Sequence, residues 1–359
     1  MNSYELNKYL NMAGYSLQLP DKKIEELNNN YKALSNYIAN KHKLAQTEEY
    51  SIYQQGSFAI DTAIKPLKND SFDVDVIVEF DMNMSEITPM DFYKQLYKTF
   101  KEGKYSDKVE EYRNCIRINY DNNYHFDIMP AIPLAYNSES LYVPDKKKTD
   151  WVVRAPKSYA KRFNDQAEKM QLRDSFSHGE VIPLKKPEPY ELKPTLNRIV
   201  QLLKRARDIY FKDYDDNYPQ SIVLTTLAAE FYDGNTSLYD SFLSIVKKMK
   251  RLKDSNSRFD VFNPGSKGRE NFTEKWKRKT IYYEHFSTFV DYIYDNLLKM
   301  KNNSTFKSSF TNLFGDSITD KVKSRTVFDS IWEYKSNITN ENIFPNSKVL
   351  IEKKERGNA

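Results

Sequence analysis

Two aspartates, Asp73 and Asp75, stand at alternate positions in the run FDVDVIVEF. Alternate side chains of a β-strand share one face, so the two carboxylates would lie side by side while Val74, Val76 and Val78 face the other way. Burial makes two neighbouring negative charges costly, whereas a hard divalent cation turns their repulsion into coordination. The pattern therefore predicts a cation site whose natural occupant is Mg²⁺. The alternative for the pair alone is an exposed strand with two solvated aspartates.

Two further features favour the metal interpretation. Gly56 and Ser57 stand where a short strand should turn into a helix, and a glycine followed by free amides and a hydroxyl can cradle a phosphate there. A Gly-Ser pair by itself is more often a turn or a cap. Asp127 interrupts the apolar run YHFDIMPAI, and an intervening helix and strand would bring its strand beside the first. Three carboxylates would then surround two metal ions about 4 Å apart.

Hydrophobic periodicity predicts the elements that position these residues. We expect a long helix from Asp21 to about residue 46, and a hairpin formed by residues 114–119 and 124–129 around a turn at 121–123. The other segments expected before residue 155 are a strand at 51–55, a helix at 58–62, a strand at 72–80 and a helix at 88–100. After Pro156 the clearest segments are helical, at 192–211, 221–232, 238–252 and 276–300. The predicted fold class is α+β, with a mixed-sheet lobe over 1–155 and an α-helical lobe over 156–359. We expect the helical lobe to complete an active-site cleft beside the aspartates.

Composition narrows the class of protein. The 359 residues are 39% hydrophobic and 29% charged, which excludes collagen-like and disordered chains. The single Cys115 cannot form an internal disulfide, and no run is apolar enough to cross a bilayer or to serve as a signal peptide. We therefore expect a cytoplasmic protein.

Charge is unevenly distributed along the chain. Residues 1–155 hold 19 basic and 23 acidic side chains, whereas residues 156–359 hold 36 and 27. Two basic runs in the second half, at 247–253 and 267–279, would suit an activating RNA or DNA. The alternative is a pair of solvated helix faces.

The arrangement Gln55-Gly56-Ser57, then Asp73-x-Asp75, then Asp127 resembles the nucleotidyltransferase signature with polymerase-β-type topology. Longer segments resemble one branch of that superfamily, the bacterial cGAS/DncV-like nucleotidyltransferases (CD-NTases). These segments are GSFAIDTAIKP, WVVRAPKSYAKRF, LNRIVQLLKRARDIYF, YPQSIVLTTLAA and NPGSKGRENFTEKW.

The resemblance implies a synthase that joins nucleoside triphosphates, ATP with GTP or with a second ATP, into a cyclic di- or trinucleotide and releases pyrophosphate. The product would be a second messenger that a downstream effector senses in the anti-phage arrangement called CBASS. Asp73, Asp75 and Asp127 would hold two Mg²⁺ ions, for which Mn²⁺ could substitute, and Gly56 and Ser57 would hold the triphosphate.

Two more residues carry roles through the resemblance. Lys204 matches a family lysine that reaches the donor phosphates, and Ser221 stands where relatives place a residue that contacts the base. The alternatives are a solvated helix lysine and a serine that caps the helix following Pro219, of which we favour the cap as the main role of Ser221.

Three other functions compete with cyclic synthesis. A linear polymerase or a tRNA-end nucleotidyltransferase would use the same carboxylates but would release linear products or extend an RNA. A toxin-antitoxin enzyme would instead transfer one nucleotide onto a protein or an RNA. A nucleic-acid-binding protein without catalysis belongs to a different class, and the complete set of three aspartates argues against it.

Overall fold

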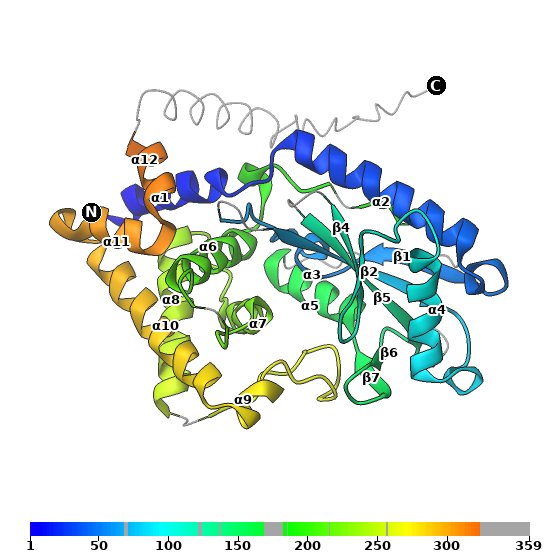
Figure 1. The fold of residues 1–359 in the computed structure, drawn as a ribbon. Coiled ribbons are helices and arrows are strands. Elements are labelled where there is room, and N and C mark those ends of the chain that lie inside the picture. The colour runs from blue at the N-terminus through cyan, green and yellow to red at the C-terminus, as the bar shows by residue number, and fades with distance from the viewer. Residues whose placement is uncertain are drawn as a thin grey trace, which may run out of the picture.

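The computed structural model describes residues 1–67, 71–120, 124–135, 138–168, 182–184, 186–214, 216–255 and 258–323. A mixed sheet fills one half of the molecule and a group of helices the other (Figure 1). The strands are β1 (Tyr50–Gln54), β2 (Phe72–Phe80), β3 (Val109–Glu111), β4 (Ile116–Tyr120), β5 (Tyr124–Pro133), β6 (Leu141–Asp145) and β7 (Asp150–Arg154). Their order is β1-β2-β5-β4-β3, and β6 joins β5 to β7. Within this described sheet β2 and β5 run parallel, and the other neighbours are antiparallel.

The central strand β2 separates its apolar face from its acidic face. Val74, Val76 and Val78 are fully buried in a core with helices α2 (Asp21–Lys41) and α4 (Pro89–Lys101). Asp73 and Asp75 therefore lie on the opposite face, as strand alternation requires. The short helix α3 (Gly56–Ala59) follows β1, and α5 (Pro156–Glu168) follows β7.

The helical half has its own core, built on α6 (Thr195–Tyr210) and α7 (Ser221–Phe231). Helix α7 contributes buried apolar side chains to this core. The remaining helices are α8 (Leu238–Ser255), α9 (Glu274–Arg278), α10 (Ile281–Lys299), α11 (Asn303–Phe314) and α12 (Asp316–Lys323). The N-terminal helix α1 (Ser3–Ser16) packs here too, because Leu6, Leu10 and Ala13 belong to the same buried cluster. The division of the chain into 1–155 and 156–359 stays a prediction.

Most predicted elements are confirmed, including the α+β class, the strand at 72–80 and the placement of β5 beside β2. Several helix boundaries are wrong. The helix predicted at 58–62 spans Gly56–Ala59, with Ile60 as its C-cap. The helix predicted at 192–211 begins at Thr195, because Lys193 precedes a proline and is extended.

The helix from Asp21 ends at Lys41, because His42 is extended and its buried ring packs 5.2 Å from the Phe80 ring. The segment at 276–300 is two helices, α9 and α10, separated at the extended Lys279. The predicted turn at 121–123 lies outside the described residues.

No helix in the described part of the chain is both long enough and apolar enough to cross a membrane.

Candidate active site

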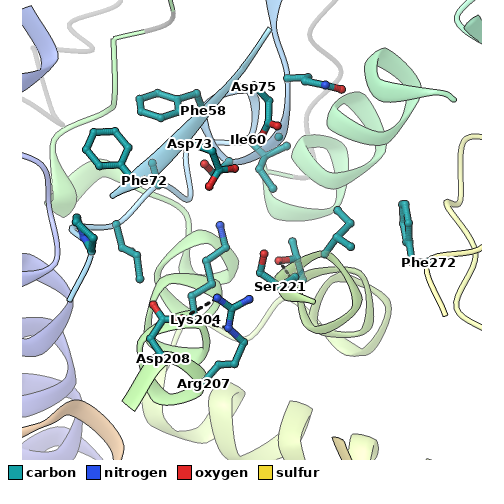
Figure 2. Close-up of a pocket in the computed structure, with 18 of the residues that line it drawn as sticks. Phe58, Ile60, Phe72, Asp73, Asp75, Lys204, Arg207, Asp208, Ser221 and Phe272 are labelled. Atoms are coloured by element: carbon teal, nitrogen blue, oxygen red, sulfur yellow. Dashed lines mark hydrogen bonds and ion pairs between the residues drawn. The ribbon is translucent and has the colours of Figure 1, made fainter. Parts of the chain in front are cut away.

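A cleft of about 750 Å³ lies between the acidic face of β2 and the helices α5, α6 and α7. Figure 2 shows Asp73 and Asp75 on one side of it, with Lys204 extending from α6 toward Asp73 on the other. The predicted site residues that line the cleft are Gln55, Gly56, Ser57, Asp73, Asp75, Lys204 and Ser221. The structure therefore gathers residues from four separate segments, and of the predicted set only Asp127 is not part of the lining.

Gly56 and Asp75 approach each other so closely that no side chain fits at position 56. Gly56 has a φ of 61°, a left-handed conformation that favours glycine, and a Cβ atom there would collide with the Asp75 carboxylate. A backbone hydrogen bond of 2.9 Å from Gln55 N to Asp75 O fixes the same approach. The phosphate-cradle hypothesis requires the backbone at Gly56 to lie this close to the carboxylates.

Asp75 and Asp127 are directly opposed across the parallel β2–β5 pair. Burial raises the pKa of Asp75 well above its usual value, and the negative charges of Asp73 and Asp127 raise it further. The positive charge of Lys204 opposes this rise but does not cancel it.

Asp127 is held by an arginine that sequence reasoning missed. Arg117 on β4 donates from Nε to Asp127 Oδ1 and from Nη2 to Asp127 Oδ2, each at 2.8 Å. The Arg117 guanidinium also lies 4.0 Å from the centre of the Tyr112 ring. The predicted hairpin contained the signal, because its register places position 117 opposite position 127.

The carboxylates suit a hard divalent cation chemically, although they are not assembled around one. Within the described residues, no three His, Cys, Asp or Glu side chains are arranged to hold a metal ion. Asp73 and Asp75 nonetheless offer adjacent oxygen donors in the cleft, and the repulsion on buried Asp75 is what a cation would relieve. The donor set therefore fits a divalent cation, and the three-carboxylate metal site stays a prediction.

Lys204 is not the solvated lysine of the alternative hypothesis. Its Nζ donates to the carbonyl oxygen of Thr62 at 3.0 Å and lies 3.1 Å from Thr62 Oγ1. Burial and, to a smaller extent, the positive charge of Arg207 lower the pKa of Lys204 to about 8, although the negative charge of Asp73 opposes the shift. The ammonium is thus held inside the cleft wall, facing the carboxylates.

Ser221 is not the helix cap that we favoured. Gln220 occupies the cap position of α7 without a side-chain hydrogen bond, and Ser221 is the first helical residue. Gln220 is extended and the helix begins directly after it, so the cap falls one residue earlier than expected. The Ser221 side chain lies at the cleft (Figure 2), and its contact with a base stays a prediction.

Sequence reasoning also missed several polar residues of the cleft. They are Arg154, Arg207, Asp208, Asn263 and Glu270. Arg154, Asn263 and Glu270 stand in segments that served only for the family resemblance, and no local pattern marks them as parts of a site.

The basic run at 247–253 lies on α8, and that at 267–279 covers a loop and α9. Several of these cations already have acidic partners: Lys253 lies 2.9 Å from Asp291, and Lys277 lies 2.7 Å from Asp260. A nucleic-acid groove formed by the two runs stays a prediction.

Comparisons with known proteins identify related sequences. Residues 5–167 match the Second Messenger Oligonucleotide or Dinucleotide Synthetase domain. A c-di-GMP synthase from Roseivirga ehrenbergii is 31% identical over 305 residues, which cover 83% of this chain and 80% of that protein. The cyclic dinucleotide synthase CdnG of Bradyrhizobium diazoefficiens is 22% identical over 80% of this chain and 74% of its own length.

Solved structures share the fold. The structure of that CdnG in complex with GTP has a TM-score of 0.74 at 18% identity, covering 89% of this chain and 98% of the other. The cyclic AMP-GMP synthase DncV of Vibrio cholerae has a TM-score of 0.62 at 16% identity, covering 84% and 93%.

The fold and the site together define a nucleotidyltransferase. Within that class, the chain belongs to the CD-NTase family of cyclic dinucleotide synthases. The family resemblance, the enzyme class and cyclic-nucleotide synthesis predicted from the sequence are confirmed.

Proposed function

We propose that this enzyme joins two molecules of GTP into cyclic di-GMP at the cleft between β2 and α6. The convergence of Gly56, the paired carboxylates and Lys204 on one cleft of about 750 Å³ carries the proposal, because this cleft has room for a triphosphate where the charges meet. The choice of GTP follows the relative of 31% identity, a c-di-GMP synthase. Participation of ATP, expected from the sequence, stays a prediction.

Asp73, Asp75 and Asp127 would hold two divalent ions, Mg²⁺ or Mn²⁺. Such ions activate an attacking hydroxyl and neutralise charge on the triphosphate. CD-NTases as a nucleotidyltransferase family generally use divalent metals. The carboxylates suit this role because they supply hard oxygen donors and because Asp73 and Asp127 repel the buried Asp75 carboxylate.

The chain's own groups would bind and align the donor triphosphate. Gly56 offers backbone free of any side chain, Ser57 adds a hydroxyl, and the Lys204 ammonium lies on the facing wall. In each round a ribose hydroxyl of one nucleotide attacks the α-phosphorus of the other. A P–O bond forms, the bond to the β-phosphate oxygen breaks, pyrophosphate leaves, and the hydroxyl proton passes to solvent. A second round within the linear intermediate closes the ring.

An equimolar mixture of ATP, GTP, CTP and UTP tests the choice of base. Wild-type enzyme with Mg²⁺ should yield one phosphatase-resistant product whose mass is that of cyclic di-GMP. A mass containing adenine would replace the GTP proposal by the mixed ATP and GTP reaction. A linear product or a labelled macromolecule would support the competing transferases.

We further expect the product to act as a second messenger in anti-phage defence, in the cytoplasm. Activation by RNA or DNA is a separate hypothesis, based on the basic runs at 247–253 and 267–279. A gain in activity on adding duplex RNA that disappears at high salt would support it, because such binding releases counterions. No response to duplex RNA or DNA would remove it.

A further inference from the structure

A loop from the helical half closes over the point where the chain leaves the sheet. The chain passes from β7 to α5 through Arg154 and Ala155, and the loop formed by residues 261–273 (the 261–273 loop) packs against this crossing. An isolated antiparallel β-bridge pairs Phe262 with Asn271, so the loop folds back on itself. The loop also lines the cleft, with Asn263, Glu270 and Phe272. Figure 2 shows Phe272 at this wall of the cleft.

The Glu270 carboxylate gathers three groups at this crossing. Its Oε2 accepts hydrogen bonds from Ala155 N at 3.2 Å and from Asn263 Nδ2 at 2.7 Å. Its Oε1 lies 3.4 Å from Arg154 Nε. The Glu270 side chain is only 11% exposed, so this negative charge acts on Arg154 with little screening by water.

The 261–273 loop has little freedom to move Glu270. Asn263 is 2% exposed and donates from Nδ2 to the carbonyl oxygen of Ala155 at 3.2 Å. Gly265 lies against Ser158 of α5 so closely that a Cβ atom would collide with it. The amide of Glu270 itself donates to Ser266 Oγ at 3.1 Å. The carboxylate is therefore placed by both halves of the molecule.

The Arg154 side chain lies in the cleft wall and is 30% exposed. Its Nε faces Glu270, and its Nη1 donates to the carbonyl oxygen of Val153 at 3.2 Å. Among the described residues no acceptor pairs with Nη2. Nη1 has a second hydrogen, so Nη1 and Nη2 together can donate two parallel hydrogen bonds to O6 and N7 of guanine, whereas adenine presents one acceptor and one donor at the same edge.

We propose that Glu270 is a positioning residue that holds Arg154 in the cleft wall, where Arg154 selects guanine over adenine. The inference rests on the proposed function in one respect, the use of GTP as substrate. It assigns the 261–273 loop a role in substrate choice, in addition to joining the two halves.

The variant Glu270→Gln tests the positioning role, because it keeps the size of the side chain and removes the charge that faces Arg154. We expect KM for GTP to rise about tenfold with little change in kcat, since an interaction with the bound base is lost. Binding of a fluorescent GTP analogue should weaken equally. In an equimolar ATP and GTP mixture the variant should incorporate more adenine than the wild type. The control is Glu274→Gln on α9, which removes an exposed ion pair with Arg278 and should change none of these values.

Arg154→Lys tests the same proposal without touching the loop, because lysine keeps the charge but lacks the planar fork. It should lose guanine selectivity to a similar extent. Adding Glu270→Gln to Arg154→Lys should cause no further loss, because Glu270 acts through Arg154. Additive effects, or a fall in kcat with unchanged KM and base ratio, would overturn the proposal. A wild type that uses no GTP would refute both the proposed function and guanine selection, whereas a GTP-using wild type with uncoupled positions 154 and 270 would refute only this inference.

Discussion

Asp75 and Asp127, far apart in the sequence, face each other in register across the parallel β2–β5 pair. Asp75 is buried and is repelled by neighbouring negative charges, whereas Asp127 accepts two hydrogen bonds from Arg117 on the next strand. The enzyme thus concentrates negative charge on one sheet face at a cost in stability, and this cost has measurable consequences.

Replacing Asp75 with asparagine should stabilise the metal-free protein while abolishing turnover. Folding raises the pKa of Asp75, so its ionised form opposes folding. The free energy of unfolding therefore falls as pH rises from the ordinary pKa of an aspartate toward neutral. Asparagine removes that penalty, which we expect to be about 1 kcal/mol, or roughly 2–4 °C in Tm. Thermal unfolding in EDTA at pH 7 measures it. An unchanged or lower Tm would show that the charge is already compensated.

Gly56→Ala should disable the enzyme without unfolding it. The new Cβ atom would displace the Asp75 carboxylate, and a displacement of that size in an aligned site lowers turnover about 100-fold. Gly268→Ala is the matched control, because Gly268 also has positive φ, at 80°, but nothing lies near its missing Cβ. Both variants should lose about 1 kcal/mol of stability from backbone strain. Steady-state rates and urea unfolding separate the two effects, and equal rates in both variants would contradict the account.

The free enzyme should lose activity as pH rises above about 8. Lys204 has its pKa lowered to about 8, so its ammonium is present below that pH and is lost above it. If the charge binds the donor phosphates, kcat/KM for GTP falls through this range, since that ratio reports groups of the free enzyme. Lys204→Met should be about 10- to 100-fold slower at pH 7 and should lack this fall. A wild-type profile that stays flat from pH 7 to 10 would exclude the role of Lys204.

The same substitution has the opposite effect on stability. A lysine whose pKa is lowered by folding destabilises the folded protein when it is charged, and this penalty disappears as pH rises toward 10.5. Lys204→Met should therefore unfold at a higher temperature than the wild type at pH 7, and the difference should shrink at pH 10.

Arg117→Ala should destabilise the protein by about 2 kcal/mol, because it leaves the half-buried Asp127 carboxylate without its bidentate partner. Arg117→Lys should lose less, since it keeps the charge but not the fork. The comparison is Arg278→Ala, which breaks an exposed pair with Glu274 and should cost less than about 0.5 kcal/mol. Urea unfolding of the three variants measures these losses, and an Arg117→Ala loss no larger than that of Arg278→Ala would mean that the Arg117–Asp127 pair contributes nothing.

Sequence patterns predicted the elements whose periodicity is strong. The alternation of FDVDVIVEF specifies both the extent of β2 and the face that carries Asp73 and Asp75. Prediction was poorer where tertiary packing decides. His42 ends α2 by packing on Phe80, and the extended Lys279 interrupts a helical pattern that otherwise continues from 276 to 300.

The candidate site was predicted where a residue's role follows from its own strand or turn. The Gly56, Asp73 and Asp75 group belongs to this kind. Glu270 and Arg154 do not, because their interaction joins segments that are far apart in sequence and neither lies in a distinctive local pattern. Arg117 is intermediate, since the hairpin register would have placed it opposite Asp127.

The most direct test of the central claim is the product formed from α-labelled GTP and Mg²⁺, after phosphatase treatment, with wild-type enzyme and with Asp73→Asn. The account predicts a phosphatase-resistant cyclic product from the wild type, with one pyrophosphate released for each GTP consumed, and a loss of several orders of magnitude in a folded Asp73→Asn variant. Undiminished synthesis by that variant, or a product that phosphatase fully degrades, would contradict it.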